Sequence, residues 1–254
     1  MNFRAAIIGC GMIAGRFEDF NISPTYSHAK AFLQNSAFGD LGFYDRHQER
    51  AENLAFKAKG KAFDSIEKLL NSFRPDVVSI CVTDEEHYGV MNLIMRSKYA
   101  PRLIFAEKPL CTRREELTNL IRLEVESKSS IIVNHSRRFD LGHQRIKNLL
   151  TSRELGEPVY LHINYYGGWH HMGVHIVDTL QFFFNDELQI DSVEYCCESK
   201  YAHDPTLNIQ GNISSASVRL DGFPENYYQI LDMNLMCQAG QIKLSDFGNR
   251  IDVL

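Results

Sequence analysis

The spacing of hydrophobic positions changes near the middle of this chain. Before about residue 130, short apolar runs alternate with segments in which apolar residues recur at helical intervals. Unbroken apolar runs are typical of strands that are buried on both faces, as in a parallel sheet. We expect such strands at residues 5–8, 41–44, 75–82, 103–106 and 131–133. Strands that alternate with helices predict a doubly wound parallel α/β sheet of the Rossmann type, in a first domain over residues 1–130.

Extended segments dominate the second half, which we expect to form a second domain over residues 131–254. The strands predicted there are 159–166, 190–197, 213–220, 227–235 and 241–244, and the one predicted helix is 168–184. Consecutive strands backed by a single helix predict an α+β domain with a mostly antiparallel sheet.

The turn after the first strand carries the first candidate site. Residues 9–14 read Gly-Cys-Gly-Met-Ile-Ala between an apolar run and helical spacing, which is the context that a dinucleotide-binding turn requires. Gly9 allows the tight turn, and Gly11 lets a pyrophosphate approach the backbone. A helix predicted at 12–20, broken at 21–24 and resumed at 26–33, presents its first N–H groups to phosphate. The residues expected to bind the cofactor here are Gly9, Gly11, Met12 and Ile13.

Polar side chains follow the other predicted strands. The carboxyl ends of parallel strands open onto one crevice, so we expect these side chains to line it. Asp45 stands where an acid accepts hydrogen bonds from the adenosine ribose, whereas its neighbour Arg46 suits a 2′-phosphate. NAD is therefore favoured, and NADP stays open. The remaining residues expected to contact the cofactor are Thr83, His87, Glu107, Lys108 and Asn134.

Composition narrows the class of protein. The 254 residues carry a formal net charge of −5, whereas nucleic-acid-binding proteins normally present a basic face, so we expect no nucleic-acid partner. No apolar run approaches the roughly 20 residues of a membrane helix, so we expect no membrane partner. Six cysteines without metal-ligand spacing fit reduced thiols, which favours a cytoplasmic protein.

These motifs together resemble the Gfo/Idh/MocA family, that is, glucose–fructose oxidoreductase, inositol dehydrogenase and their relatives. The resemblance rests on the glycine turn at 9–14, the Glu-Lys-Pro-Leu at 107–110, and the segments 133–139 and 168–178. It implies an NAD(P)-dependent oxidoreductase that acts on a sugar, a cyclitol or a nucleotide sugar. It also implies a lysine and a histidine at the hydride-transfer centre, and homodimers or homotetramers packed through the second domain's sheet.

Two residues, Lys108 and His175, match the catalytic lysine and histidine that the resemblance implies, and His171 is a third candidate. Lys108 would hold the reacting oxygen, and His175 would act as general acid or base, because histidine titrates near neutrality. His171, four residues earlier on the same predicted helical face, would position the substrate. Histidines at this spacing can also share a metal ion, but no glutamate accompanies them as in a metalloprotease, so we expect no metal.

Two departures from the family pattern keep another function open. His171 stands where many members have an aspartate, and the chain is shorter than many members. The alternative is a sensor of the same fold that binds NAD(P)(H) or a sugar without turnover. The sequence does not identify the substrate.

Overall fold

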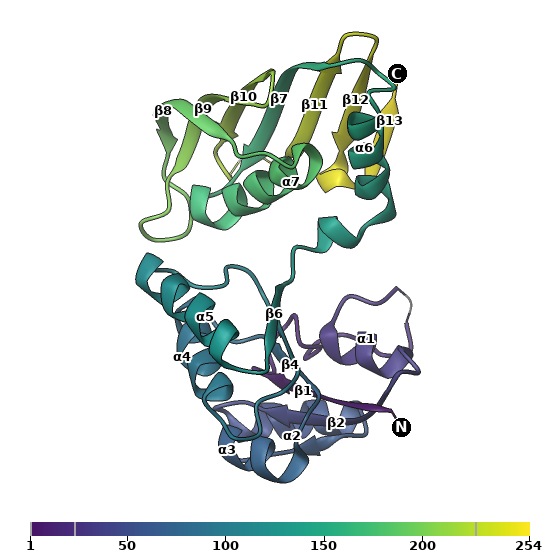
Figure 1. Cartoon of the computed structure of the whole chain (residues 1–254), viewed down its shortest axis with the longest axis vertical. Coiled ribbons are helices and arrows are strands. Elements are labelled where there is room, and N and C mark those ends of the chain that lie inside the picture. Colours follow the sequence, from purple (N-terminus) through teal and green to yellow (C-terminus); the bar gives the residue numbers. More distant parts are fainter. Residues whose placement is uncertain (1, 23, 227) are drawn as a thin grey trace. The chain divides into compact units, whose positions relative to one another are not determined.

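A computed structural model describes residues 2–22, 24–226 and 228–254. The chain divides into two compact units, Met1–Asn134 (unit 1) and His135–Leu254 (unit 2). Each unit has a sheet and helices of its own (Figure 1). The described residues form two hydrophobic clusters in unit 1 and one in unit 2.

Unit 1 is a six-stranded parallel sheet in the order β3-β2-β1-β4-β5-β6. This is the strand order of dinucleotide-binding Rossmann folds, so the predicted fold class of the first half is confirmed. Its strands are β1 (Phe3–Ile8), β2 (Phe38–Tyr44), β3 (Lys61–Ala62), β4 (Val77–Ile80), β5 (Leu103–Ala106) and β6 (Ser130–Val133). Its helices are α1 (His28–Gln34), α2 (Gln48–Lys57), α3 (Ile66–Lys68) with the π-turn η1 (Leu69–Phe73), α4 (Asp84–Met95) and α5 (Arg114–Glu126).

The apolar run of β1 is unbroken because the strand is buried from both sides. Ala6 and Ile8 belong to the cluster that α3, η1, α4 and α5 build, whereas Ala5 and Ile7 belong to the cluster that α1 and α2 build. All four side chains are fully buried. Successive side chains of a strand point to opposite faces, so helices on both faces require apolar residues at every position.

The prediction of a helix directly after the glycine turn is wrong. Residues 12–20 form turns, the predicted break at 21–24 includes Ser23, which lies outside the described residues, and α1 begins only at His28. The first N–H groups of α1 nevertheless return to the glycine turn, since His28 donates to Ile13 O at 3.1 Å and Ala29 donates to Ala14 O at 3.1 Å. Residues 16–27, which we call the inserted loop, thus separate the turn from the helix in sequence but not in space.

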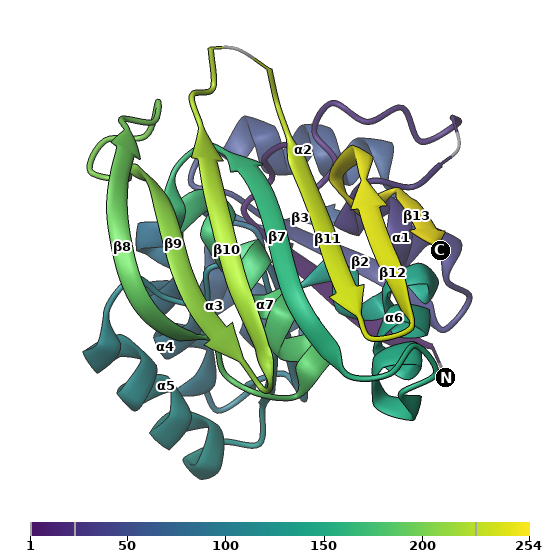
Figure 2. The same ribbon diagram turned by 90° about the horizontal axis from the view of Figure 1, so that it is seen from above.

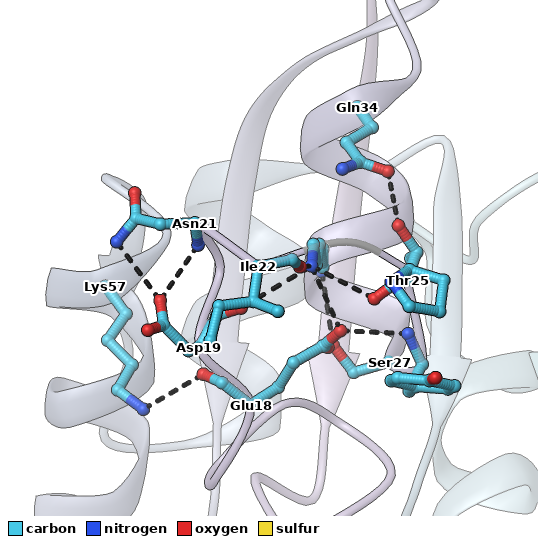
Figure 3. Close-up of polar contacts among 11 residues, drawn as sticks. Glu18, Asp19, Asn21, Ile22, Thr25, Ser27, Gln34 and Lys57 are labelled. Carbon is cyan, nitrogen blue, oxygen red and sulfur yellow. Dashed lines mark hydrogen bonds and ion pairs between the residues drawn. The ribbon is translucent and has the colours of Figure 1, made fainter.

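Lys30 of α1 holds the inserted loop in place. Its side chain is almost fully buried, and its ammonium donates to the carbonyl oxygens of Asp19, Ile22 and Pro24. The Glu18 carboxylate lies 3.4 Å from the same ammonium. Figure 3 shows these contacts converging on the end of one side chain, with Lys57 donating to the loop from the side. Polar loop backbone is therefore satisfied by a buried cation instead of by helix hydrogen bonds.

Unit 2 is a seven-stranded sheet in the order β13-β12-β11-β7-β10-β9-β8. Among the described strand pairs of this sheet only β7–β10 is parallel, so the predicted mostly antiparallel sheet is confirmed. The strands are β7 (Pro158–Tyr166), β8 (Gln189–Cys197), β9 (Thr206–Ile213), β10 (Ala216–Phe223), β11 (Leu231–Cys237), β12 (Gly240–Ser245) and β13 (Arg250–Val253). The helical segments are η2 (Ser136–Phe139), α6 (Leu141–Ser152), η3 (Trp169–Gly173), α7 (Val174–Phe184) and η4 (Asp246–Gly248).

One face of this sheet packs against α6 and α7, and no helix formed by the described residues of unit 2 covers the other face (Figure 2). Alternate residues of β7, namely Leu161, Ile163 and Tyr165, are fully buried on the helix side. The prediction of a single helix for this half missed α6, which covers the sheet together with α7.

Two predicted strands of unit 2 differ in their bounds. The strand expected at 213–220 spans the turn that separates β9 from β10. The strand expected at 227–235 begins at Tyr227, which lies outside the described residues, and the observed strand β11 begins only at Leu231 and ends at Cys237. Short β-branched segments do not show from spacing alone where one strand ends and the next begins.

Candidate functional site

The glycine turn lies directly against the end of β4. Gly9 has φ +89°, and a Cβ at this position would lie 2.5 Å from Cys81 O. Its N–H donates to Tyr44 O at 2.8 Å, which fixes the turn to the end of β2 as well. Gly9 is thus required by the protein's own backbone, since no side chain fits between the turn and β4.

Gly11 is required for a different reason. A Cβ added there would meet no protein atom within 4 Å, so the space beside the turn is open. Met12 and Ile13 follow with exposed side chains. An open approach to backbone at the carboxyl end of a parallel sheet is what a pyrophosphate requires, so the turn fits a dinucleotide.

A cavity of about 250 Å³ extends from this turn along the ends of β2 and β4. Five of the residues expected to bind cofactor line it, namely Gly9, Gly11, Asp45, Arg46 and Thr83. Residues from three separate parts of unit 1 are therefore brought together.

Asp45 is held at this cavity by backbone. Only 7 % of the residue is exposed. One carboxylate oxygen accepts the N–H of Cys10 at 2.7 Å, and the other accepts the N–H of His47 at 2.8 Å. Arg46 is exposed, and its guanidinium pairs with the Glu86 carboxylate at 3.1 Å. The Asp45 carboxylate thus has a fixed orientation, and the Arg46 guanidinium already forms an ion pair with Glu86.

Glu107 is the centre of a polar network at the ends of β5 and β6. One of its oxygens lies 2.8 Å from His28 Nε2 and 2.7 Å from Asn134 Nδ2. Burial acts to raise the pKa of Glu107, but the hydrogen bonds from His28 and Asn134 outweigh it and hold the pKa below the ordinary 4.5. Glu107 is therefore ionised at neutral pH. The sequence pattern did not indicate His28, because the inserted loop places it far along the chain from the glycine turn.

Lys108 is joined to Pro109 by a cis peptide bond, and His87 contacts this turn. Lys108 is partly exposed. His87 is fully buried, and its ring nitrogens lie 2.7 Å from Pro109 O and 3.2 Å from Val82 O. The expected contact between His87 and cofactor is not what this geometry favours. His87 instead supports the turn that carries Lys108.

In unit 2, His171 and His175 do not belong to one continuous α-helix. His171 lies in the π-turn η3, and His175 lies in the first turn of α7. The Asp204 carboxylate accepts the backbone N–H of His171 at 3.0 Å, and Tyr201 Oη lies 3.1 Å from His171 Nε2. The helix expected over both histidines is therefore not a regular α-helix, because its first turn is π-helical.

His175 lines a second cavity, of about 850 Å³ and within unit 2, together with Arg137 and Tyr166. Burial lowers the pKa of Arg137, and its guanidinium donates to Phe247 O at 3.3 Å. The next arginine, Arg138, forms a two-point pair with the Asp178 carboxylate at 2.8–3.1 Å. This cavity combines an imidazole, a phenol and a guanidinium, which suits a polar ligand.

Neither a metal centre nor a membrane segment is present among the described residues. No cluster of three or more His, Cys, Asp or Glu side chains there is arranged to hold a metal ion. No described helix has both the length and the apolar character needed to cross a bilayer.

Comparison with known proteins agrees with the fold. The model of the family described as "Oxidoreductase family, NAD-binding Rossmann fold" (GFO_IDH_MocA) matches residues 3–135, just over half of the chain. An inositol 2-dehydrogenase of Salmonella paratyphi B is 24 % identical over 243 residues, which cover 90 % of this chain and 69 % of that protein.

Two solved structures illustrate the similarity in three dimensions. A myo-inositol dehydrogenase from Lactobacillus casei, in complex with NAD(H) and myo-inositol, has a TM-score of 0.75 at 16 % identity, covering 98 % of this chain and 75 % of that one. A mutant of a 3-ketoreductase from Actinomadura kijaniata, in complex with TDP-benzene and NADP, has a TM-score of 0.81 at 15 % identity, covering 100 % and 84 %. At these identities the similarity shows a shared fold.

Proposed function

Because this chain belongs to the Gfo/Idh/MocA oxidoreductase family, as the match over residues 3–135 shows, we propose that it transfers a hydride between a nicotinamide cofactor and a hydroxyl-bearing carbon of a sugar, cyclitol or nucleotide sugar. The family and the fold are the ones that the sequence predicted. The observation that carries the proposal is the cavity that gathers Gly9, Gly11, Asp45 and Thr83 at the carboxyl ends of a parallel sheet. The names of the relatives favour a cyclitol as the first substrate to test.

We propose NAD over NADP. The carboxylate of Asp45 is fixed by two backbone N–H groups, and a fixed negative charge beside the ribose accepts hydroxyl hydrogens but repels a 2′-phosphate. Arg46 would have to leave its ion pair with Glu86 to compensate that phosphate. Met12 and Ile13 would flank the pyrophosphate, and Glu107 and Asn134 the nicotinamide end.

Nicotinamide, when bound, supplies the acceptor for the hydride, and the protein manages position and proton. We propose that the ammonium of Lys108 donates hydrogen bonds to the reacting oxygen and stabilises the negative charge that develops on it. His175 takes the hydroxyl proton during oxidation and returns it during reduction. His171, oriented by Tyr201, holds another substrate hydroxyl.

We also propose homodimers or homotetramers that pack through the sheet of unit 2, and a cytoplasmic location. The sheet face opposite α7 has polar cross-strand pairs such as His162–Asp221 at 2.8 Å and Gln241–Asn234 at 2.7 Å. Light scattering on the purified protein tests the assembly.

The first experiment is a fluorescence titration of the protein with NADH and with NADPH, followed by turnover assays on sugars, cyclitols and nucleotide sugars. We expect NADH to bind more tightly and a polyol to be oxidised. Lys108→Ala should abolish most turnover, with kcat at least about 100-fold lower, while NADH still binds. A fully active variant would rule out the proposed role of Lys108. Tight NADH binding without turnover on any substrate would favour a sensor of the same fold.

A further inference from the structure

His28 connects three parts of unit 1 that are distant in sequence. Its backbone N–H donates to Ile13 O in the glycine turn at 3.1 Å. Its Nδ1 lies 3.1 Å from Ser79 Oγ on β4, and its Nε2 lies 2.8 Å from Glu107 Oε1 after β5. Only 7 % of the residue is exposed. The first residue of α1 therefore couples the phosphate-binding turn to the turn that carries Lys108.

The direction of these hydrogen bonds follows from the chemistry of the partners. An ionised carboxylate only accepts, so the tautomer of His28 that fits this site has its N–H at Nε2 and donates a hydrogen bond to Glu107. In that tautomer Nδ1 accepts a hydrogen bond from the hydroxyl group of Ser79, which is fully buried. Glu107 also accepts from Asn134 Nδ2 and from the backbone N–H of Lys108. The carboxylate thus accepts hydrogen bonds from three protein donors.

The ammonium of Lys108 does not take part in this network. Glu107 is the residue directly before Lys108, and an acid and a base side by side in a chain normally attract one another. Among the described residues of unit 1, however, the Glu107 carboxylate is hydrogen-bonded to His28, and no carboxylate lies within 4.0 Å of the Lys108 ammonium. The arrangement keeps the two charges apart.

We propose that His28 is a positioning residue, whose imidazole holds the Glu107 carboxylate away from the neighbouring Lys108 and so leaves the lysine ammonium available to a substrate oxygen. The inference rests on the proposed role of Lys108 in turnover. The separation of the Glu107 carboxylate from the Lys108 ammonium can nevertheless be tested without a substrate.

Acylation of lysine tests that separation without turnover. The full-length protein is labelled with a trace of acetic anhydride near pH 8, and the modification of Lys108 is compared with that of exposed Lys61 by peptide mass spectrometry. In His28→Ala, Glu107 is free to pair with Lys108 and to hold it protonated, so acylation of Lys108 relative to Lys61 should fall about tenfold. Ser79→Ala removes only the other hydrogen bond of His28 and should stay within about twofold of wild type.

Two further variants identify the cause. His28→Gln can still donate to Glu107 and should restore most of the Lys108 reactivity. Glu107→Gln in the His28→Ala background removes the competing charge and should restore it too, as expected for residues that act through one another. Should His28→Ala fail to fold, His28→Asn, which is polar but too short to reach Glu107, repeats the measurement. Unchanged acylation of Lys108 in a folded His28→Ala or His28→Asn variant would overturn the proposal.

Kinetics then connect the separation to function. With myo-inositol, or whichever polyol wild type oxidises, His28→Ala should lower kcat at least about tenfold, with the Kd for NADH within about twofold, because Gly11 and Asp45 still hold the cofactor. A purely structural role would lower Tm and leave kcat unchanged below the melting range. If wild type oxidises no polyol, the proposed function fails, whereas the acylation result still decides the role of His28.

Discussion

At the scale of single residues, Gly9 and Gly11 show that one motif can serve two purposes. A side chain at Gly9 would collide with the backbone of Cys81, so the fold itself requires this glycine. A side chain at Gly11 would enter open space, so we attribute this glycine to ligand binding. Conversely, two different residues can serve one purpose. His87 and His28 are both buried, and both contact the turn that carries Lys108, His87 through Pro109 and His28 through Glu107.

The contrast predicts that fold and binding can be separated at Gly11. Gly11→Val should leave Tm within a few degrees of wild type but weaken NADH binding by at least about 100-fold, a loss of about 2.7 kcal/mol, because the side chain occupies the approach to the turn. Gly89→Val is the matched control, since Gly89 on α4 is also open to an added Cβ. NADH affinity equal to wild type in Gly11→Val would contradict the assignment of the turn.

At the scale of elements, the inserted loop explains why the first helix was predicted in the wrong place. The segment 12–20 has helical spacing, but Lys30 binds the loop carbonyls and so satisfies backbone that would otherwise need helix hydrogen bonds. The return of α1 to Ile13 and Ala14 restores the usual contact between helix and turn. It also accounts for the long separation in sequence between the glycines and Asp45.

Lys30→Met should therefore release the inserted loop. Removing one partner of a buried pair leaves Glu18, whose side chain is 11 % exposed, without compensation, and we expect a loss of about 3 kcal/mol in the free energy of unfolding. Urea unfolding measures this loss, and trypsin cleavage after Arg16 should become faster. Lys57→Met, which removes a donor from the loop's outer side, serves as control and should cost less than about 1 kcal/mol. Trypsin resistance equal to wild type in Lys30→Met would show that other contacts hold the loop.

At the scale of the whole molecule, both units depend on ionised carboxylates. In unit 1, burial acts to raise the pKa of Glu107 and of Glu18, but hydrogen bonds from His28 and Ser27 respectively, among others, lower both. In unit 2, the hydrogen bond from His143 lowers the pKa of Asp140. For Asp221, burial acts to raise the pKa, and the hydrogen bonds from Arg219 and His162, among other contacts, together outweigh it. Each native pKa lies below its ordinary value of 4.5 or 3.8, so folding favours the ionised form.

The sign of this linkage predicts acid destabilisation. A carboxylate with a lowered native pKa contributes its stability above the unfolded pKa, and that contribution is lost as pH falls through the native pKa. The urea midpoint should therefore change little between about pH 7 and pH 5 and fall progressively between about pH 5 and pH 3. Glu107→Gln should reduce the slope of that fall. A midpoint that rises on acidification would contradict the assigned ionisation states.

The sequence by itself determined the fold class of each half and the residues of the dinucleotide turn. Burial on both faces of β1 requires an unbroken run of apolar residues, and the turn consists of a few consecutive residues, so both can be recognised in the sequence. It also placed Asp45, Glu107 and Lys108 at strand ends, since parallel strands end on one edge. Only the tertiary structure decided the start of α1, the π-turn at His171, the second helix of unit 2 and the partnership of His28 with Glu107. These depend on contacts between residues that are distant in sequence, such as Lys30 with the inserted loop and Asp204 with η3. Such contacts produce no periodic pattern of apolar residues from which they could be predicted.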